Sequence, residues 1–113
     1  MGSNDPHAAI KRVTKPTLMV LTALVDHPSR RWYGLELCKK TGLAAGTLYP
    51  ILARLEHNGW LGSQWEEPER QESERRPRRR YYWLTETGRA EAWWIVWLKS
   101  GGTVQLEPER GSA

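Results

Sequence analysis

Apolar residues recur at helical spacing in the middle of the chain. The stripe at i, i+3, i+4 and i+7 consists of Leu48, Ile51, Leu52 and Leu55. This spacing predicts a helix over residues 44–60 with one buried face, and Gly59 is a natural stop after the last apolar turn. Pro50 falls in the second turn, so only the first turn has to loosen around it. The helix could equally be an ordinary amphipathic core helix.

Two further helices are predicted upstream. Residues 16–25 carry an apolar stripe made of Leu18, Leu21, Leu24 and Val25. Residues 34–41 form a second helix that Gly42 closes, with Leu35 and Cys38 on its inner side. Because a very short bridge joins this helix to residues 44–60, the pair is typical of a helix-turn-helix motif. The polar connector at 29–32 leaves a short strand as an open alternative.

The apolar period changes from 3.6 to 2 after Gly59. Residues 60–66 and 80–84 are rich in aromatic residues that favour strands, and their inner face is expected to hold Leu61, Tyr82 and Leu84. The polar stretch 67–79 cannot form a core, so the two strands make a hairpin with a polar tip. Thr85 then caps a last helix that runs to about Ser100. Together these elements predict a mainly α winged helix-turn-helix fold with a small β-hairpin wing.

Composition narrows the class of protein. The chain of 113 residues suits one domain, and its net charge of +4 makes polyanions plausible partners. The single cysteine, Cys38, excludes an internal disulfide framework and fits a reducing compartment. No apolar run reaches the roughly 20 residues that cross a bilayer, and no signal-peptide core opens the chain. A soluble cytoplasmic protein is therefore expected.

Catalytic and metal-binding chemistry find little support in the sequence. The three histidines have no metal-ligand spacing, and Cys38 has no neighbouring Cys or His, so a zinc site is not expected. No carboxylate pair, nucleophile motif or phosphate-cradling glycine loop stands out. We expect neither an enzyme nor a cofactor.

Three segments stand out in the order and spacing of a known family: WYGLEL at 32–37, GTLYPILARLE at 46–56 and RRRYYWLTETG at 78–88. Together they resemble the PadR family of bacterial transcriptional regulators, and the resemblance covers roughly residues 14–99. It implies a homodimer that binds a palindromic operator and usually represses, often relieved by a small aromatic or amphiphilic effector. It also implies that the last helix joins the two subunits, as in the short class of the family. Trp83, where the family more often has a charged residue, and Ala44-Ala45, in place of a Ser-Pro type of entry, depart from its pattern.

The domain organisation follows from these elements and the resemblance. Residues 10–84 are expected to form the DNA-binding domain and residues 85–100 the dimerisation helix. Residues 1–9 and 101–113 have the composition of flexible ends.

The helix at 44–60 carries the first set of candidate DNA contacts. Ala45, Gly46 and Thr47 are small enough to approach the major-groove floor, where Thr47 can bond a base edge or present its methyl group to thymine. Tyr49 and Arg54 reach toward phosphates, although partial burial of Tyr49 against the first helix is an alternative. The resemblance adds Tyr33 as a contact to the DNA backbone.

The arginines of the wing form the second set. The densest positive cluster in the chain comprises Arg70, Arg75, Arg76, Arg78, Arg79 and Arg80, tempered by Glu66, Glu67, Glu69, Glu72 and Glu74. Such a tip can follow the minor groove or its flanking phosphates, and we expect DNA contacts from Arg76, Arg78 and Arg79. The alternative is a solvated loop that partly neutralises itself. Lys11, Arg12 and Lys15 are weaker candidates for phosphate contacts.

Trp93, Trp94 and Trp97 crowd one sector of the last helix. Each can bury about 200 Å², more than a terminal helix of this size needs within one subunit. We expect one of them to pack on the first helix and two to join a second subunit. Across a two-fold axis they could also line a cleft for a flat aromatic effector.

A winged-helix protein-interaction module without specific DNA binding is the alternative function.

Overall fold

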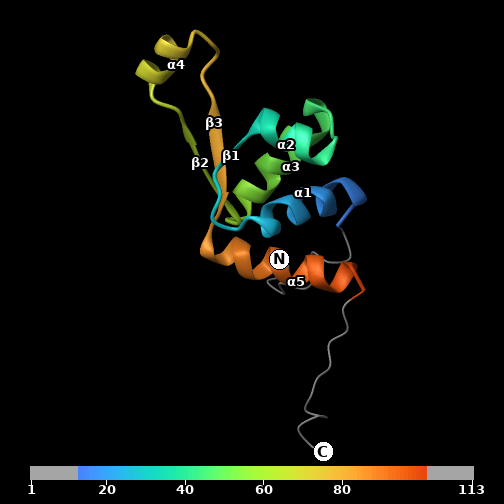
Figure 1. Cartoon of the computed structure of the whole chain (residues 1–113). Coiled ribbons are helices and arrows are strands. Elements are labelled where there is room, and N and C mark those ends of the chain that lie inside the picture. Colours follow the sequence, from blue (N-terminus) through green and yellow to red (C-terminus); the bar gives the residue numbers. More distant parts are fainter. Residues whose placement is uncertain (1–12, 102–113) are drawn as a thin grey trace, which may run out of the picture.

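The computed structural model describes residues 13–101, which form five helices and a three-stranded antiparallel sheet (Figure 1). The predicted mainly helical class with a small β wing is confirmed. The expected flexible ends and the candidates Lys11 and Arg12 lie outside the described residues, apart from Gly101, which ends the described part in a turn. None of the described helices is long and apolar enough to cross a membrane.

The first helix, α1 (Lys15–Asp26), extends one residue beyond each end of the predicted range 16–25. The Thr14 hydroxyl accepts a hydrogen bond from the Thr17 N–H at 3.3 Å and so caps the first turn. Pro16 fits in this turn because the first helical N–H groups have no acceptor within the helix. The fully buried side chains of α1 are those of Val20, Leu21 and Leu24. They place α1 in the middle of the hydrophobic core.

The helix-turn-helix consists of α2 (Gly34–Thr41) and α3 (Ala45–His57). Gly42 joins them in the left-handed conformation, with φ of 80°, and its N–H bonds the Cys38 carbonyl at 2.8 Å. A residue with a side chain would be strained at this angle, which explains the glycine. The predicted inner stripe of α3 is confirmed, since all four of its apolar side chains are buried.

The predicted inner side of α2 is wrong in one position. Leu35 points outward and is 61% exposed, whereas Leu37 is fully buried. Gly34 is also buried, because the Tyr49 side chain of α3 lies directly against it. The buried face of α2 therefore passes through Gly34 and Leu37, three residues apart, and Leu35 falls beside it. With only eight residues in the helix, its periodicity was too short to identify that face.

The sheet has the strand order β1-β3-β2 and is built from β1 (Trp32–Tyr33), β2 (Leu61–Trp65) and β3 (Arg80–Leu84). The short strand in the connector is thus present, and Trp32 pairs with Tyr82. In the hairpin, Leu61 faces Leu84, which confirms the inner face predicted for the two strands.

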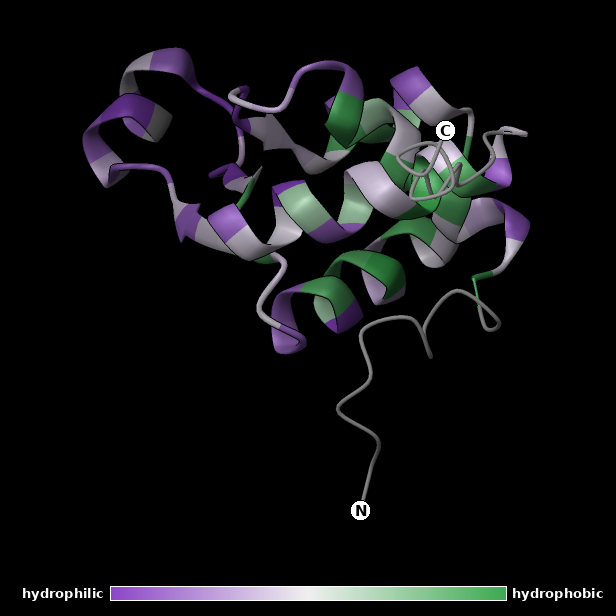
Figure 2. Ribbon diagram, turned by 90° about the horizontal axis from the view of Figure 1, so that it is seen from below, coloured by the Kyte–Doolittle hydropathy of each residue, from purple (hydrophilic) through white to green (hydrophobic). Residues whose placement is uncertain are grey.

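The wing differs from the expected polar tip because it contains a short helix, α4 (Pro68–Glu74). Pro68 stands in the first turn, where its missing N–H costs nothing, and Glu69 beside it suits the positive end of a helix. Arg75 ends the helix in the left-handed conformation, with φ of 54°. Figure 2 shows the α4 lobe as strongly hydrophilic, so the expectation that this stretch forms no core holds.

The last helix, α5 (Glu86–Lys99), packs along α1 at the end of the molecule opposite the wing tip (Figure 1). Thr85 caps it as predicted, with its hydroxyl accepting the Gly88 N–H at 3.0 Å. Ala92 and Ile95 are fully buried. At Gly88 the helix crosses the Trp60 carbonyl so closely that a Cβ would overlap it. This glycine lets α5 dock against the start of the wing.

Candidate nucleic-acid interface

The N-terminal end of α3 is open to solvent. Ala45, Gly46 and Thr47 are all exposed, while Leu48 next to them is fully buried. The N-cap residue Ala44 makes no side-chain capping hydrogen bond, so the first turn keeps unsatisfied N–H groups. A helix end of this kind attracts anions through those groups and the helix dipole.

Tyr49 is held by the neighbouring helix. Its side chain is 39% exposed, and a Cβ on Gly34 would overlap its hydroxyl. Burial, and to a lesser extent the Cys38 thiol, raises the pKa of Tyr49 above its usual value. The hydroxyl is therefore a protonated donor at neutral pH, fixed at the start of α2.

Arg54 connects α3 to the start of α1. The residue is exposed, and its Nη2 donates a hydrogen bond to the Thr17 hydroxyl at 3.3 Å. Thr17 itself is only 7% exposed. The guanidinium group is thus held beside the first turn of α1, where Lys15 also lies.

A buried ion pair organises the wing. Glu66 is only 8% exposed, and its carboxylate accepts two hydrogen bonds from the Arg76 guanidinium, both at 2.7 Å. It also accepts the backbone N–H of Arg79 at 3.2 Å, and the Glu66 carbonyl accepts Nε of Arg78 at 2.8 Å. The bond from Arg76 and the positive groups around it lower the pKa of Glu66 to about 2, although burial opposes this shift. Sequence reasoning had counted Glu66 only as a charge that tempers the arginines.

These contacts hold one wing arginine inside the wing and leave others accessible. The guanidinium of Arg76 is largely buried and occupied by Glu66, so it is less available to DNA than the sequence suggested. Arg78 is exposed, and Arg79 lies over the Tyr33 ring at 3.9 Å from its centroid. Two of the three predicted wing contacts therefore keep an accessible position, one of them beside the predicted backbone contact Tyr33.

Trp83, which departs from the family pattern, packs on the outer face of the sheet. Its ring lies against Gly62, where a Cβ would come within 2.7 Å of the indole, and the Arg31 guanidinium stacks on it at 4.1 Å. Tyr33 and Tyr81 meet edge to face on the same side, with ring centroids 5.9 Å apart. Trp83 is thus a packing residue between Gly62 and Arg31. The sequence could not show this pairing, because it depends on the register of three strands.

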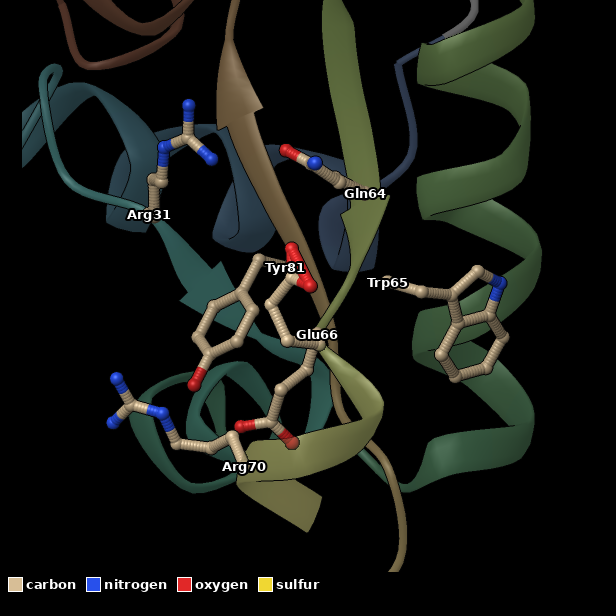
Figure 3. A pocket seen from close by; sticks show the side chains of 7 residues that line it. Arg31, Gln64, Trp65, Glu66, Arg70 and Tyr81 are labelled. Carbon is tan, nitrogen blue, oxygen red and sulfur yellow. The ribbon is translucent and has the colours of Figure 1, made fainter.

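A hollow of about 380 Å³ lies on this outer face (Figure 3). Its lining includes Arg31, Arg70 and Tyr81, and Figure 3 shows the Tyr81 hydroxyl directed toward Arg70. Glu66 and Glu67 also line it. Because both signs of charge surround the hollow, it has no clear preference for an anion or a cation.

The inner face of the wing carries a second polar network. Nη2 of Arg80 donates to the Ser63 hydroxyl at 2.6 Å, and that hydroxyl donates to the Glu56 carboxylate of α3 at 2.6 Å. Arg80 also forms an ion pair with Glu56 at 3.6 Å. The network ties the wing to α3, so these two elements keep a defined spacing.

The three tryptophans of α5 form one cluster. The rings of Trp93 and Trp97 are nearly parallel, with an angle of 5° and centroids 6.0 Å apart, and Trp94 stacks on both. Trp93 is 50% exposed. Beside it lies a mainly apolar hollow of about 520 Å³, lined by Val25 and Leu84 among others. Within residues 13–101, no group of three metal-ligating side chains comes together.

Comparison with known proteins agrees with this geometry. The family model of the transcriptional regulator PadR-like family matches residues 20–93. A search of curated proteins found no match. Among solved structures, smu.1704 from Streptococcus mutans UA159 is 26% identical, with a TM-score of 0.59 over 78% of this chain and 80% of its own.

Two further structures have the same fold. A PadR-like transcription factor from Bacteroides fragilis is 24% identical, with a TM-score of 0.59 over 96% of this chain and 100% of its own. A PadR family transcription regulator from Clostridium difficile R20291 is 24% identical, with a TM-score of 0.57 over 77% of this chain and 84% of its own. With the family model covering most of the described residues, this chain belongs to the PadR-like family of transcriptional regulators and is a DNA-binding regulator, not an enzyme.

Proposed function

We propose that this protein is a dimeric repressor that reads a pseudo-palindromic operator through α3 and grips the flanking backbone with its wing. The observation that carries the proposal is the open, small-residue end of α3 beside an ordered wing that exposes Arg78. In a symmetric dimer, the two α3 helices would enter successive major grooves about 34 Å apart.

Each contact has a distinct role in this proposal. Thr47 reads a base edge, with Ala45 and Gly46 allowing close approach. The backbone contacts are assigned to Tyr33, Tyr49, Arg54, Arg78 and Arg79. Arg76 is reassigned to shaping the wing, because Glu66 already holds its guanidinium.

The α5 tryptophans support the dimer and an effector site. A half-exposed stacked aromatic cluster on a terminal helix is costly in water unless a partner covers it. A second copy of α5 would cover it, and the adjoining apolar hollow is large enough for a small flat aromatic compound. Such a ligand would relieve repression by changing the distance between the two α3 helices. The regulated genes are expected to lie next to its own.

A gel-shift titration tests specific binding. The full chain is titrated at physiological salt against the promoter regions of its own and neighbouring genes, with scrambled duplexes of equal length as controls. Repression predicts at least 1,000-fold tighter binding to one promoter. Equal affinity for all duplexes would refute specific repression and favour a protein-interaction role.

Salt dependence tests the wing separately. Arg78→Ala should weaken binding to every sequence and reduce the slope of log K against log salt by about 1.

Quenching of tryptophan fluorescence by a panel of aromatic compounds tests the effector site. A compound that quenches but leaves the operator complex intact would argue against relief of repression.

A further inference from the structure

Trp65 is a large aromatic residue whose exposure neither the core nor the proposed dimer explains. It is the last residue of β2 and is 49% exposed. No described residue accepts a hydrogen bond from its indole N–H. Trp65 ends β2 on the way to the wing tip, and α5 lies at the opposite end of the molecule from that tip (Figure 1), so a dimer formed through α5 would leave Trp65 uncovered.

Its position in the strand directs Trp65 toward α3. Side chains alternate between faces along β2, so Trp65 shares a face with Ser63, which bonds Glu56 of α3. Trp65 borders the hollow on the outer face, but Figure 3 shows its indole ring on the side of β2 opposite Tyr81, Arg31 and Arg70. Trp65 therefore borders the space between the wing and the recognition helix.

Two arginines flank the indole ring. The Arg80 guanidinium lies 5.3 Å from the Trp65 ring centroid, and that of Arg78 lies 5.6 Å from it. Each is oriented by a hydrogen bond, Arg80 to Ser63 and Arg78 to the Glu66 carbonyl. Glu56 pairs with Arg80, whereas Arg78 bonds a neutral backbone carbonyl, so a net positive charge remains beside the Trp65 ring and favours an anionic partner over an apolar one.

We propose that Trp65 and Arg80 form a phosphate-backbone contact of the DNA between the wing and α3. The indole N–H donates to a phosphodiester oxygen, while the ring covers the adjoining deoxyribose. Arg80, whose side chain stays 31% exposed beside Glu56, supplies positive charge to the same DNA strand. The contact rests on the proposed operator binding, and it adds two residues that sequence reasoning had not assigned to DNA.

The first test compares matched tryptophan variants of the full chain. Trp65→Phe removes the N–H and Trp65→Ala also removes the ring, and fluorescence anisotropy measures their affinity for the operator. We expect Trp65→Ala to lose on the order of tenfold and Trp65→Phe less, on operator and scrambled duplexes alike. Leu35→Ala is the control, because Leu35 is also a large exposed apolar residue but has no assigned part in binding. It should bind as the wild type does.

Replacing single operator phosphates by uncharged analogues identifies the phosphate that Trp65 contacts. Operator phosphates are replaced one at a time by methylphosphonates. One position should weaken the wild type but have no further effect on Trp65→Phe. Arg80→Gln should reduce the salt slope by about 1, whereas the Trp65 variants should leave it unchanged because they remove no charge. A variant that misfolds would have a lower unfolding temperature, and its loss of affinity would be the same at every phosphate position. Misfolding can therefore be distinguished from the loss of one phosphate contact.

The outcomes separate this inference from operator binding itself. If the wild type binds a promoter specifically but both Trp65 variants match it, the backbone contact is refuted and the proposed function stands. If the wild type shows no preference among duplexes, the proposed function fails. If it binds no duplex at all, both fail. A Trp65→Ala variant that keeps DNA affinity but no longer binds a second protein would assign this surface to a protein partner instead.

Discussion

Thr47 is exposed to solvent at the start of α3, which supports the proposal that it reads a base edge. Its neighbour Leu48 is buried, so the backbone beneath it is fixed. We expect Thr47→Ala to lose roughly 5- to 100-fold discrimination at one base pair of each half-site, with little change on scrambled DNA. Competition with operators substituted at each position would measure this. An equal loss on all sequences would instead make Thr47 a backbone contact.

Glu66 is the residue on which the shape of the wing depends. Replacing it by Gln removes the charge that pairs with Arg76 and leaves a largely buried guanidinium without its carboxylate. We expect Glu66→Gln to weaken DNA binding because Arg78 and Arg79 lose their common anchor. Glu72→Gln is the control, since Glu72 is exposed on α4. Unchanged affinity of Glu66→Gln would show that the wing holds its shape without the pair.

The lowered pKa of Glu66 predicts an acid-dependent stability. Its pKa falls from 4.5 to about 2 on folding, so its contribution is fully present above pH 4.5 and is lost as the pH falls toward 2. Thermal unfolding between pH 2 and 6 would measure this. The wild type should lose more stability over that range than Glu66→Gln, and the two should run parallel above pH 5. Parallel curves over the whole range would contradict the pairing.

At the scale of the elements, the docking of α5 depends on Gly88. A Cβ there would overlap the Trp60 carbonyl, which is backbone and cannot turn away. We expect Gly88→Ala to cost about 1–3 kcal/mol, measured by urea unfolding. Gly46→Ala is the matched control, because no atom lies within 4 Å of its Cβ position and alanine is a better helix former. A loss no larger at Gly88 than at Gly46 would mean that α5 tolerates displacement.

Most elements could be predicted because they carry their own signals. The stripe of α3, the cap at Thr85 and the stop at Gly42 all act within a few residues. The face of α2 and the helix α4 were missed for different reasons. In α2 eight residues gave too short an apolar period to identify the buried face, and in α4 a charged sequence offered no apolar period to detect.

At the scale of the whole molecule, the tryptophan cluster of α5 predicts the oligomeric state. Trp93→Ala with Trp97→Ala should shift the protein from dimer toward monomer, because about 200 Å² of aromatic surface per residue would be lost from the interface. Sedimentation velocity measures the change. Trp65→Ala is the control, since its residue lies on the wing, away from α5 (Figure 1). An unchanged mass in the double variant would refute this interface.

The sequence alone determined four of the five described helices, the two strands of the wing, their order, the core stripe of α3 and the accessible end of that helix. It also identified the basic wing and the aromatic sector of α5. These features follow from local periodicity, caps and turn residues, all of which act over a few positions.

Only the tertiary structure decided which charged side chains are bound within the protein and which remain available to a partner. Arg76 meets Glu66 ten residues away, Arg80 meets Ser63 seventeen residues away, and Trp65 turns toward α3. Strand pairing and the packing of α3 on the sheet create these contacts. A list of arginines and tryptophans cannot distinguish those that hold the wing together from those that face a partner, because that distinction depends on contacts between distant parts of the chain.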